Sequence, residues 1–145
     1  MKRASLKWVA GLMALAALTL DATAAGDAAR GADVFKENCA GCHSPERGQI
    51  LVGPSLYSVV GRTAASEAGF PYSSAMKGSG VVWTPDKLMV YLKAPRRFIP
   101  GVKMMFPGLD DEADRQNVIA FLSTLREQAQ SAPEAAAATV SRASN

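Results

Sequence analysis

The stretch Cys39-Ala40-Gly41-Cys42-His43 restricts this chain more than any other feature. It contains both cysteines and the single histidine of the 145 residues. The spacing C-x-x-C-H is typical of a c-type haem attachment site. Two thiols three positions apart on a helical turn can add across the two vinyl groups of one haem, and the next residue brings an imidazole under the iron. Since the chain has no second histidine, a second axial ligand must be another residue type, and methionine is the obvious candidate.

Two other kinds of site compete for the same residues. A thioredoxin-like dithiol follows a strand and precedes a helix, whereas residues 32–37, just before Cys39, have a helical pattern. A zinc site needs four ligands, and the sequence has no second cluster of cysteine and histidine. Haem attachment is therefore favoured, and a dithiol oxidoreductase stays open as the alternative.

The two ends of the chain have compositions unlike the middle. Residues 1–24 combine a start containing Lys2, Arg3 and Lys7, an apolar run at 8–20 and small residues at the end, which is the pattern of a secretory signal peptide. The apolar run is shorter than the ~20 residues of a membrane-spanning helix. We expect cleavage near Ala24 or Ala25, export to the periplasm and no membrane insertion. Residues 128–145 are rich in alanine and serine, and a flexible tail is expected there.

Residues 25–127 are thus expected to form one domain, near the usual size of a single folding unit. The net charge of +3 overstates the charge of that domain, because several of the basic residues belong to the predicted signal peptide. A nearly neutral domain has no electrostatic basis for binding nucleic acid.

The sequence predicts helices and long loops, and no stretch is a confident strand. One helix is expected at about 28–38 with Asp27 as its cap, a second from Thr84-Pro85 to Pro95, and a third from Asp110 or Asp111 to about 125. Residues 44–82 are rich in glycine and proline and lack apolar periodicity. Because loops that long are unusual in a compact domain, a buried cofactor is expected to hold this one in place.

Further short patterns follow the Cys-His motif in a fixed order. The chain resembles a class I c-type cytochrome, similar to mitochondrial cytochrome c and its bacterial periplasmic relatives, over residues 31–125. The patterns that carry the resemblance are Gly53-Pro54-Ser55-Leu56, Gly61-Arg62, Tyr72, Trp83, Leu88-Met89-Val90-Tyr91-Leu92 and Pro100-Gly101-Val102-Lys103-Met104-Met105-Phe106. The resemblance implies an all-α, single-domain cytochrome c fold, with three to five helices and long loops wrapped around one covalently bound haem c.

The resemblance also implies the residues of the site. His43 and Met104 would bind the iron, and the residues around the haem would be Cys39, Cys42, Pro54, Arg62, Tyr72, Ser73, Trp83 and Tyr91. The two cysteines would form the thioethers, and the Pro54 carbonyl would accept a hydrogen bond from His43. Arg62, Tyr72, Ser73 and Trp83 would hydrogen-bond or pair with the haem propionates, and Tyr91 would lie near the Met104 sulfur.

The neighbouring Met105 is expected to pack in the core, as methionine often does. Gly31 and Phe35 match positions where the first helix contacts the last, against Phe121 and Leu122.

The function implied is electron transport and not an enzymatic reaction. The protein is expected to be a soluble, monomeric periplasmic carrier that passes single electrons between respiratory or photosynthetic partners, which would be membrane redox complexes or periplasmic oxidoreductases. The alternatives are a dedicated acceptor for one periplasmic dehydrogenase, or a haem peroxidase or gas-binding protein. The Pro-Gly-Val-Lys-Met loop argues against a haem peroxidase and against a gas-binding protein, because a methionine ligand leaves no open position on the iron.

This sequence departs from the family pattern around the expected haem. Val102 stands where threonine is usual, and Met76 stands where asparagine is frequent. Both changes remove polar groups, so we expect them to raise the reduction potential. The lysines that surround the haem edge in well-known members are also replaced, at Asp33, Asn38, Leu51, Asp110 and Asp111, so weaker and less salt-dependent steering toward acidic partners is expected.

Overall fold

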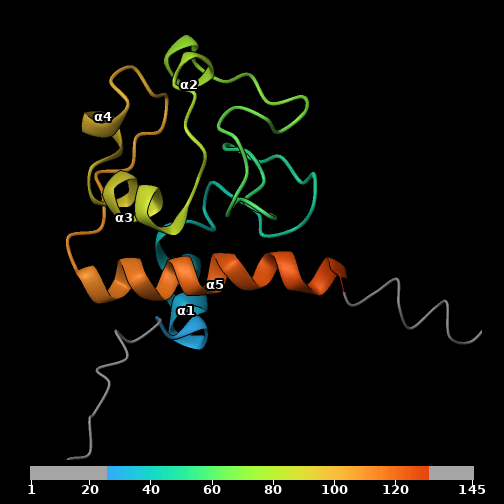
Figure 1. Ribbon diagram of the computed structural model, residues 1–145, viewed down its shortest axis with the longest axis vertical. Helices are drawn as coiled ribbons and strands as arrows, with labels where there is room; N and C mark the ends of the chain where they lie inside the picture. The colour runs from blue at the N-terminus through green and yellow to red at the C-terminus, as the bar shows by residue number, and fades with distance from the viewer. Residues whose placement is uncertain (1–25, 131–145) are drawn as a thin grey trace, which may run out of the picture.

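The computed structural model describes residues 26–130, with side chains described as far as residue 126. The predicted signal peptide, at residues 1–24, and residues 131–145 of the predicted tail lie outside this part. Five helices make up the described fold (Figure 1): α1 (Ala28–Asn38), α2 (Ser74–Gly78), α3 (Pro85–Lys93), α4 (Pro95–Phe98) and α5 (Glu112–Gln130). Between residues 26 and 130 the extended pairing is limited to one isolated bridge, between Thr63 and Val82. The prediction of an all-α fold is confirmed.

Helix α1 begins where the sequence predicts. The Asp27 side chain accepts hydrogen bonds from the backbone N–H groups of Ala29 and Arg30, at 2.8 and 3.2 Å, which satisfies two of the free donors at the helix start. The backbone N–H of Asp27 itself donates to the Asn117 side chain on α5 at 2.8 Å. The cap therefore also anchors the start of α1 to the last helix.

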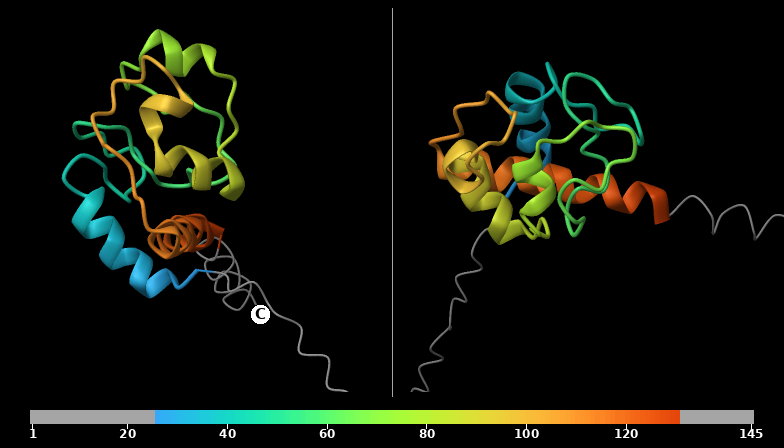
Figure 2. Two further views of the ribbon diagram at one scale, coloured as in Figure 1. Left: turned by 90° about the vertical axis from the view of Figure 1, so that its left-hand side faces the viewer. Right: turned by 90° about the horizontal axis from the view of Figure 1, so that it is seen from above.

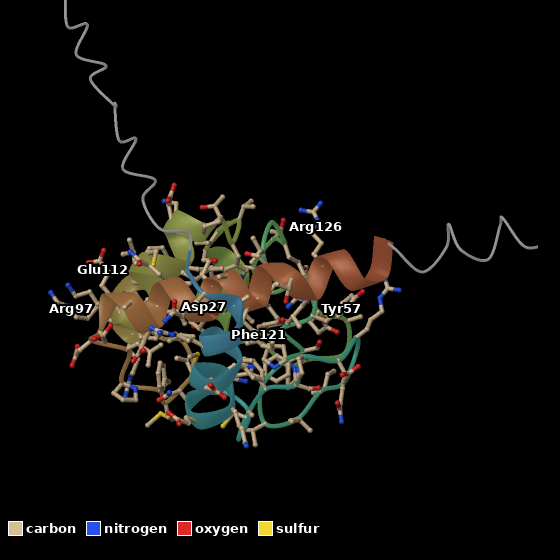
Figure 3. The ribbon with its side chains drawn as sticks, turned by 90° about the horizontal axis from the view of Figure 1, so that it is seen from below. Asp27, Tyr57, Arg97, Glu112, Phe121 and Arg126 are labelled. Atoms are coloured by element: carbon tan, nitrogen blue, oxygen red, sulfur yellow. The ribbon has the colours of Figure 1, made fainter. Side chains whose placement is uncertain are left out.

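Helices α1 and α5 cross in close contact, as Figure 3 shows near the labelled Phe121. Gly31 lies at the crossing, where a β-carbon would be 2.0 Å from the Asn117 carbonyl oxygen. Beside it, the rings of Phe35 and Phe121 pack with their centroids 5.2 Å apart. The predicted contact between the first and last helices is confirmed at these residues.

Helix α3 also has the predicted ends. The Thr84 side chain caps it by accepting from the Lys87 N–H, Pro85 occupies its first turn, and it ends at Lys93, before Pro95. Its buried face consists of Leu88, Tyr91 and Leu92, and the helix packs on α5. Pro95 then begins the short α4, a turn that the sequence did not predict separately.

The segment 44–82 is irregular apart from α2, whose first turn is capped by the Ser73 hydroxyl. Backbone hydrogen bonds fasten it at its two ends, from Gly53 N–H to the Cys42 carbonyl at 2.8 Å and from Ala64 N–H to the Val81 carbonyl at 2.7 Å. This segment, α2, α3 and α4 all lie on the same side of α5 (Figure 2). The interior that they surround contains the candidate site.

Helix α5 begins at Glu112, directly after the predicted start, and the Asp111 side chain accepts from the Asp114 N–H at 3.1 Å. The helix continues to Gln130, beyond the domain boundary expected at residue 127. Within residues 26–130, no helix combines the length and the apolar character that crossing a bilayer requires.

Candidate functional site

A cavity of about 610 Å³ lies between the long loop, α3 and α5. Its volume falls within the range of roughly 300–1,000 Å³ that is common for cofactor sites. All ten residues that the sequence predicts for the site line this cavity: Cys39, Cys42, His43, Pro54, Arg62, Tyr72, Ser73, Trp83, Tyr91 and Met104. Apart from the Cys-His motif and the adjacent Tyr72 and Ser73, they are separated in the sequence, and the fold brings them together.

The two cysteines lie in a turn that continues directly from α1. The N–H of Cys39 donates to the Phe35 carbonyl, and the N–H groups of Cys42 and His43 donate to the Cys39 carbonyl, at 3.0 and 2.9 Å. Neither thiol is in a disulfide, and Cys39 is half-buried whereas Cys42 is exposed. Burial, with a smaller effect from Cys42, raises the pKa of the Cys39 thiol to about 11. A dithiol oxidoreductase needs a lowered thiol pKa, so the structure disfavours that alternative.

The His43 imidazole is held in one tautomer. Its Nδ1 lies 2.8 Å from the Pro54 carbonyl oxygen. Because a carbonyl oxygen only accepts, Nδ1 must carry the hydrogen, which leaves the lone pair of Nε2 free to bind a metal. Burial lowers the pKa of His43, and the hydrogen bond to Pro54 opposes part of that shift. The ring is therefore kept in the neutral form that a ligand requires.

Gly53 has a role in the site that the sequence reasoning missed. A β-carbon on Gly53 would lie 2.3 Å from Cε1 and 2.6 Å from Nδ1 of His43, so any side chain there would displace the ring. The sequence signal was present, since the glycine immediately precedes Pro54, which accepts from the imidazole. Gly53 thus leaves room for the imidazole beside its acceptor.

The Met104 side chain is oriented by Tyr91 on α3. The Tyr91 hydroxyl donates to the Met104 sulfur at 3.4 Å. Burial raises the pKa of Tyr91 to about 12, so the phenol keeps its proton at neutral pH. The preceding residue, Lys103, holds the loop from the other side, because its ammonium donates to the Pro71 carbonyl at 2.8 Å. A thioether sulfur has two lone pairs, so a donor on one leaves the other for a metal.

Met105 does not pack in the core, and that prediction is wrong. Its side chain is 78% exposed, whereas Met76 is buried and Met89 half-buried. The reason is that residues 99–111 are loop, where neighbouring side chains need not follow a helical face.

The Arg62 side chain is fixed by protein groups at the cavity wall. Its Nη2 donates to the Ser55 carbonyl at 2.7 Å, and its Nη1 donates to the Tyr57 carbonyl at 2.9 Å and to the Glu67 carboxylate at 2.8 Å. Glu67 was not predicted from the sequence. No local pattern marks it, because its partner Arg62 lies in a different turn of the irregular segment.

Ser73, Tyr72 and Trp83 also contact other protein groups. The Ser73 hydroxyl accepts from the Met76 N–H as the α2 cap, which leaves its own hydrogen available for donation. Burial raises the pKa of Tyr72, with the backbone of Glu67 and the charge of Arg62 opposing part of the rise. The Trp83 ring packs on Tyr91, with centroids 4.7 Å apart.

This arrangement fits one haem attached through two thioethers. The lining is mostly apolar, which suits the porphyrin, and no carboxylate side chain among the described residues lines it. One wall offers two free thiols and a neutral imidazole, and another offers a thioether sulfur. Nitrogen and sulfur ligands of this kind are those that hold haem iron.

Comparisons with known proteins agree with this chemistry. Residues 28–126 match the family model described as cytochrome c. The chain is 46% identical over 101 residues to cytochrome c2 of Rhodopila globiformis, covering 70% of this chain and 95% of that protein. It is 48% identical over 104 residues to the cytochrome c-type cyt cy of Rhodobacter capsulatus, covering 72% of this chain and 52% of that protein. The match therefore spans about half of the latter relative's length.

Among solved structures, cytochrome cH from Methylobacterium extorquens resembles this fold with a TM-score of 0.65 and 40% sequence identity. The likeness covers 68% of this chain and 99% of that protein.

Proposed function

Because this chain belongs to the cytochrome c family and is an electron carrier with one covalently bound haem c, we propose that it carries single electrons in the periplasm, between membrane redox complexes or periplasmic oxidoreductases. Members of this family are electron carriers and not enzymes. The periplasmic location rests on the signal-peptide pattern of residues 1–24, which we propose is removed from the mature protein.

In this proposal, Cys39 and Cys42 hold the cofactor through thioethers, and His43 and Met104 occupy the two axial positions. Bound haem supplies a one-electron redox couple whose potential depends on the axial ligands and their surroundings. A methionine ligand favours a more positive potential than a second histidine would.

The observation that carries the proposal is that protein groups orient the side chains of both candidate ligands. Pro54 fixes the tautomer of His43, and Tyr91 directs a hydrogen toward the sulfur of Met104. Gly53 leaves room for the His43 ring, and the hydrogen bond from Lys103 to the Pro71 carbonyl holds the loop that contains Met104. Side chains held in this way need little rearrangement when the charge of the site changes, which favours fast electron exchange.

The exposed surface favours partners whose binding does not depend on a ring of lysines. Asp33, Asn38, Leu51, Asp110 and Asp111 are all exposed, so the departures from the family pattern change the surface that a partner meets. Cys42 is exposed beside the cavity, and we propose that electrons enter and leave at that edge. Mixed charges give weaker steering and less dependence on ionic strength.

The proposal is tested on the full chain expressed in a bacterium that attaches haem to proteins. The expected product is found in the periplasmic fraction, lacks residues 1–24 by mass, and keeps its pigment in acidified acetone. Reduced wild-type protein should not bind carbon monoxide at neutral pH, whereas Met104→Ala should bind it.

Met105→Ala is the matched control and should behave as wild type, since Met105 borders the cavity but its side chain is 78% exposed. Carbon monoxide binding by the wild type, or equal behaviour of the two alanine variants, contradicts Met104 as the distal ligand. An uncleaved product in the cytoplasm contradicts the periplasmic assignment.

A further inference from the structure

Glu67 forms an unusual contact for an acidic side chain in this fold. Two ion pairs occur between residues 26 and 126, and the Asp27–Arg30 pair is largely exposed. In the Arg62–Glu67 pair, by contrast, the side chains are 20% and 14% exposed and the charged atoms are 2.8 Å apart. Placing a carboxylate away from water is costly unless its partner is close and well oriented. The position of Glu67 is therefore tied to Arg62.

Arg62 lies in the wall between two cavities. It lines the main cavity, and it also lines a second cavity of about 270 Å³ with Glu67, Tyr57 and Arg47. Glu67 borders only the second of these two cavities. Arg62 thus borders the proposed haem site, and its guanidinium pairs with the Glu67 carboxylate.

The charges around the main cavity make this arrangement significant. The cationic side chains that line it are Arg62 and Lys103, and Lys103 is exposed. Arg47 faces only the second cavity, where its guanidinium carbon lies 5.6 Å from the centre of the Tyr57 ring. Among the described residues, Arg62 is consequently the half-buried positive charge that lines the site, and Glu67 offsets it.

We propose that Glu67 is a positioning residue that sets the reduction potential through Arg62. By pairing with the guanidinium, Glu67 holds it in place and cancels part of its charge at the cavity wall. Oxidation adds one positive charge to the site, so a nearby negative charge favours the oxidised state and lowers the potential. This inference rests on the proposed placement of haem against Arg62.

The test measures the midpoint potential of the haem-loaded protein in wild type and three variants of this residue. Glu67→Gln keeps the shape and removes the charge, and it should raise the potential. We expect the ratio of reduced to oxidised protein at a fixed applied potential to change by up to about tenfold, which for one electron is about 59 mV. Glu67→Asp keeps the charge and should stay nearer to wild type. Glu67→Ala should shift the potential in the same direction as Glu67→Gln.

Glu37→Gln is the matched control, because Glu37 is exposed on α1 and belongs to neither ion pair between residues 26 and 126. It makes the same change in formal charge and should move the potential little, since water and salt screen an exposed carboxylate.

The proposal is overturned if Glu67→Gln leaves the potential unchanged or lowers it. It is equally overturned if the two neutral variants shift in opposite directions, or if Glu67→Asp departs further from wild type than Glu67→Gln, since that order indicates a steric effect.

Arg62→Gln separates this inference from the proposed function. If Arg62→Gln lowers the midpoint potential and Glu67→Gln leaves it unchanged, only the proposed role of Glu67 is contradicted. If neither variant changes the midpoint potential, the placement of haem against Arg62 is contradicted.

Discussion

Replacing Gly31 by alanine should strongly destabilise the protein. The new β-carbon would lie 2.0 Å from the carbonyl oxygen of Asn117 and 2.8 Å from the β-carbon of Phe121. The Asn117 oxygen belongs to the backbone of α5, so it cannot rotate away as a side chain can. Helix α1 would have to move away from α5 before the methyl group fits.

The magnitude follows from the contacts at the crossing. Real β-carbons do not come within 3.0 Å of other heavy atoms, so the contact of 2.0 Å must open by at least 1.0 Å. Overpacking of this kind costs about 1–3 kcal/mol, and weakening the Phe35–Phe121 ring pair costs up to about 1 kcal/mol more. We therefore expect the free energy of unfolding to fall by about 1–4 kcal/mol, which for a domain of about 100 residues lowers the Tm by roughly 5–20 °C.

The assay is guanidinium unfolding of the haem-loaded protein, followed by far-ultraviolet circular dichroism. Gly78→Ala is the control, because a β-carbon there meets no atom within 4 Å. A loss of less than about 1 kcal/mol in Gly31→Ala, or an equal loss in both variants, would refute the argument that Gly31 sets the distance between the two helices.

Three further predictions concern caps, the loop before α5 and the haem surroundings. Asp27→Ala removes the α1 cap and should lower the free energy of unfolding by about 1 kcal/mol. Asp33→Ala on the same helix should lower it less, and equal losses of stability in the two variants contradict the capping role. Arg115→Met removes two hydrogen bonds from a buried guanidinium to the carbonyl oxygens of Leu109 and Asp110. It should lower the free energy of unfolding by roughly 2–3 kcal/mol in chemical unfolding, and an unchanged stability contradicts this role. Val102→Thr adds a polar group at the cavity wall and should lower the midpoint potential in a redox titration. A rise or no change argues against the expectation that losing this polar group raises the potential.

Features that depend on neighbouring residues were predictable from the sequence. The caps at Asp27 and Thr84 and the stop before Pro95 involve contacts within a few positions, and the structure confirms each. The irregular character of residues 44–82 followed from their glycines and prolines, because these residues disfavour regular helices and strands. The extension of α5 to Gln130 was missed, because the composition near residue 128 is compatible with either a helix or a tail.

Features that depend on the path of irregular segments were harder to predict. Gly53 is required by a ring ten positions earlier in the chain, and Glu67 by the guanidinium of Arg62 in another turn. Arg115 is buried although it is charged, because it donates to the carbonyls of Leu109 and Asp110 in the loop that precedes α5. Met105 was assigned to the core from its residue type, whereas the path of the loop exposes it.

The sequence by itself determined the attachment chemistry and the principal helices. Both result from residues close together in the chain, where the covalent backbone sets which groups can meet. Only the tertiary structure decided which hydrogen-bond partners orient His43, Met104 and Arg62 and which side chains surround them. Those contacts span irregular loops that no local pattern describes, and their geometry depends on how α1, α3, α5 and the long loop pack against one another.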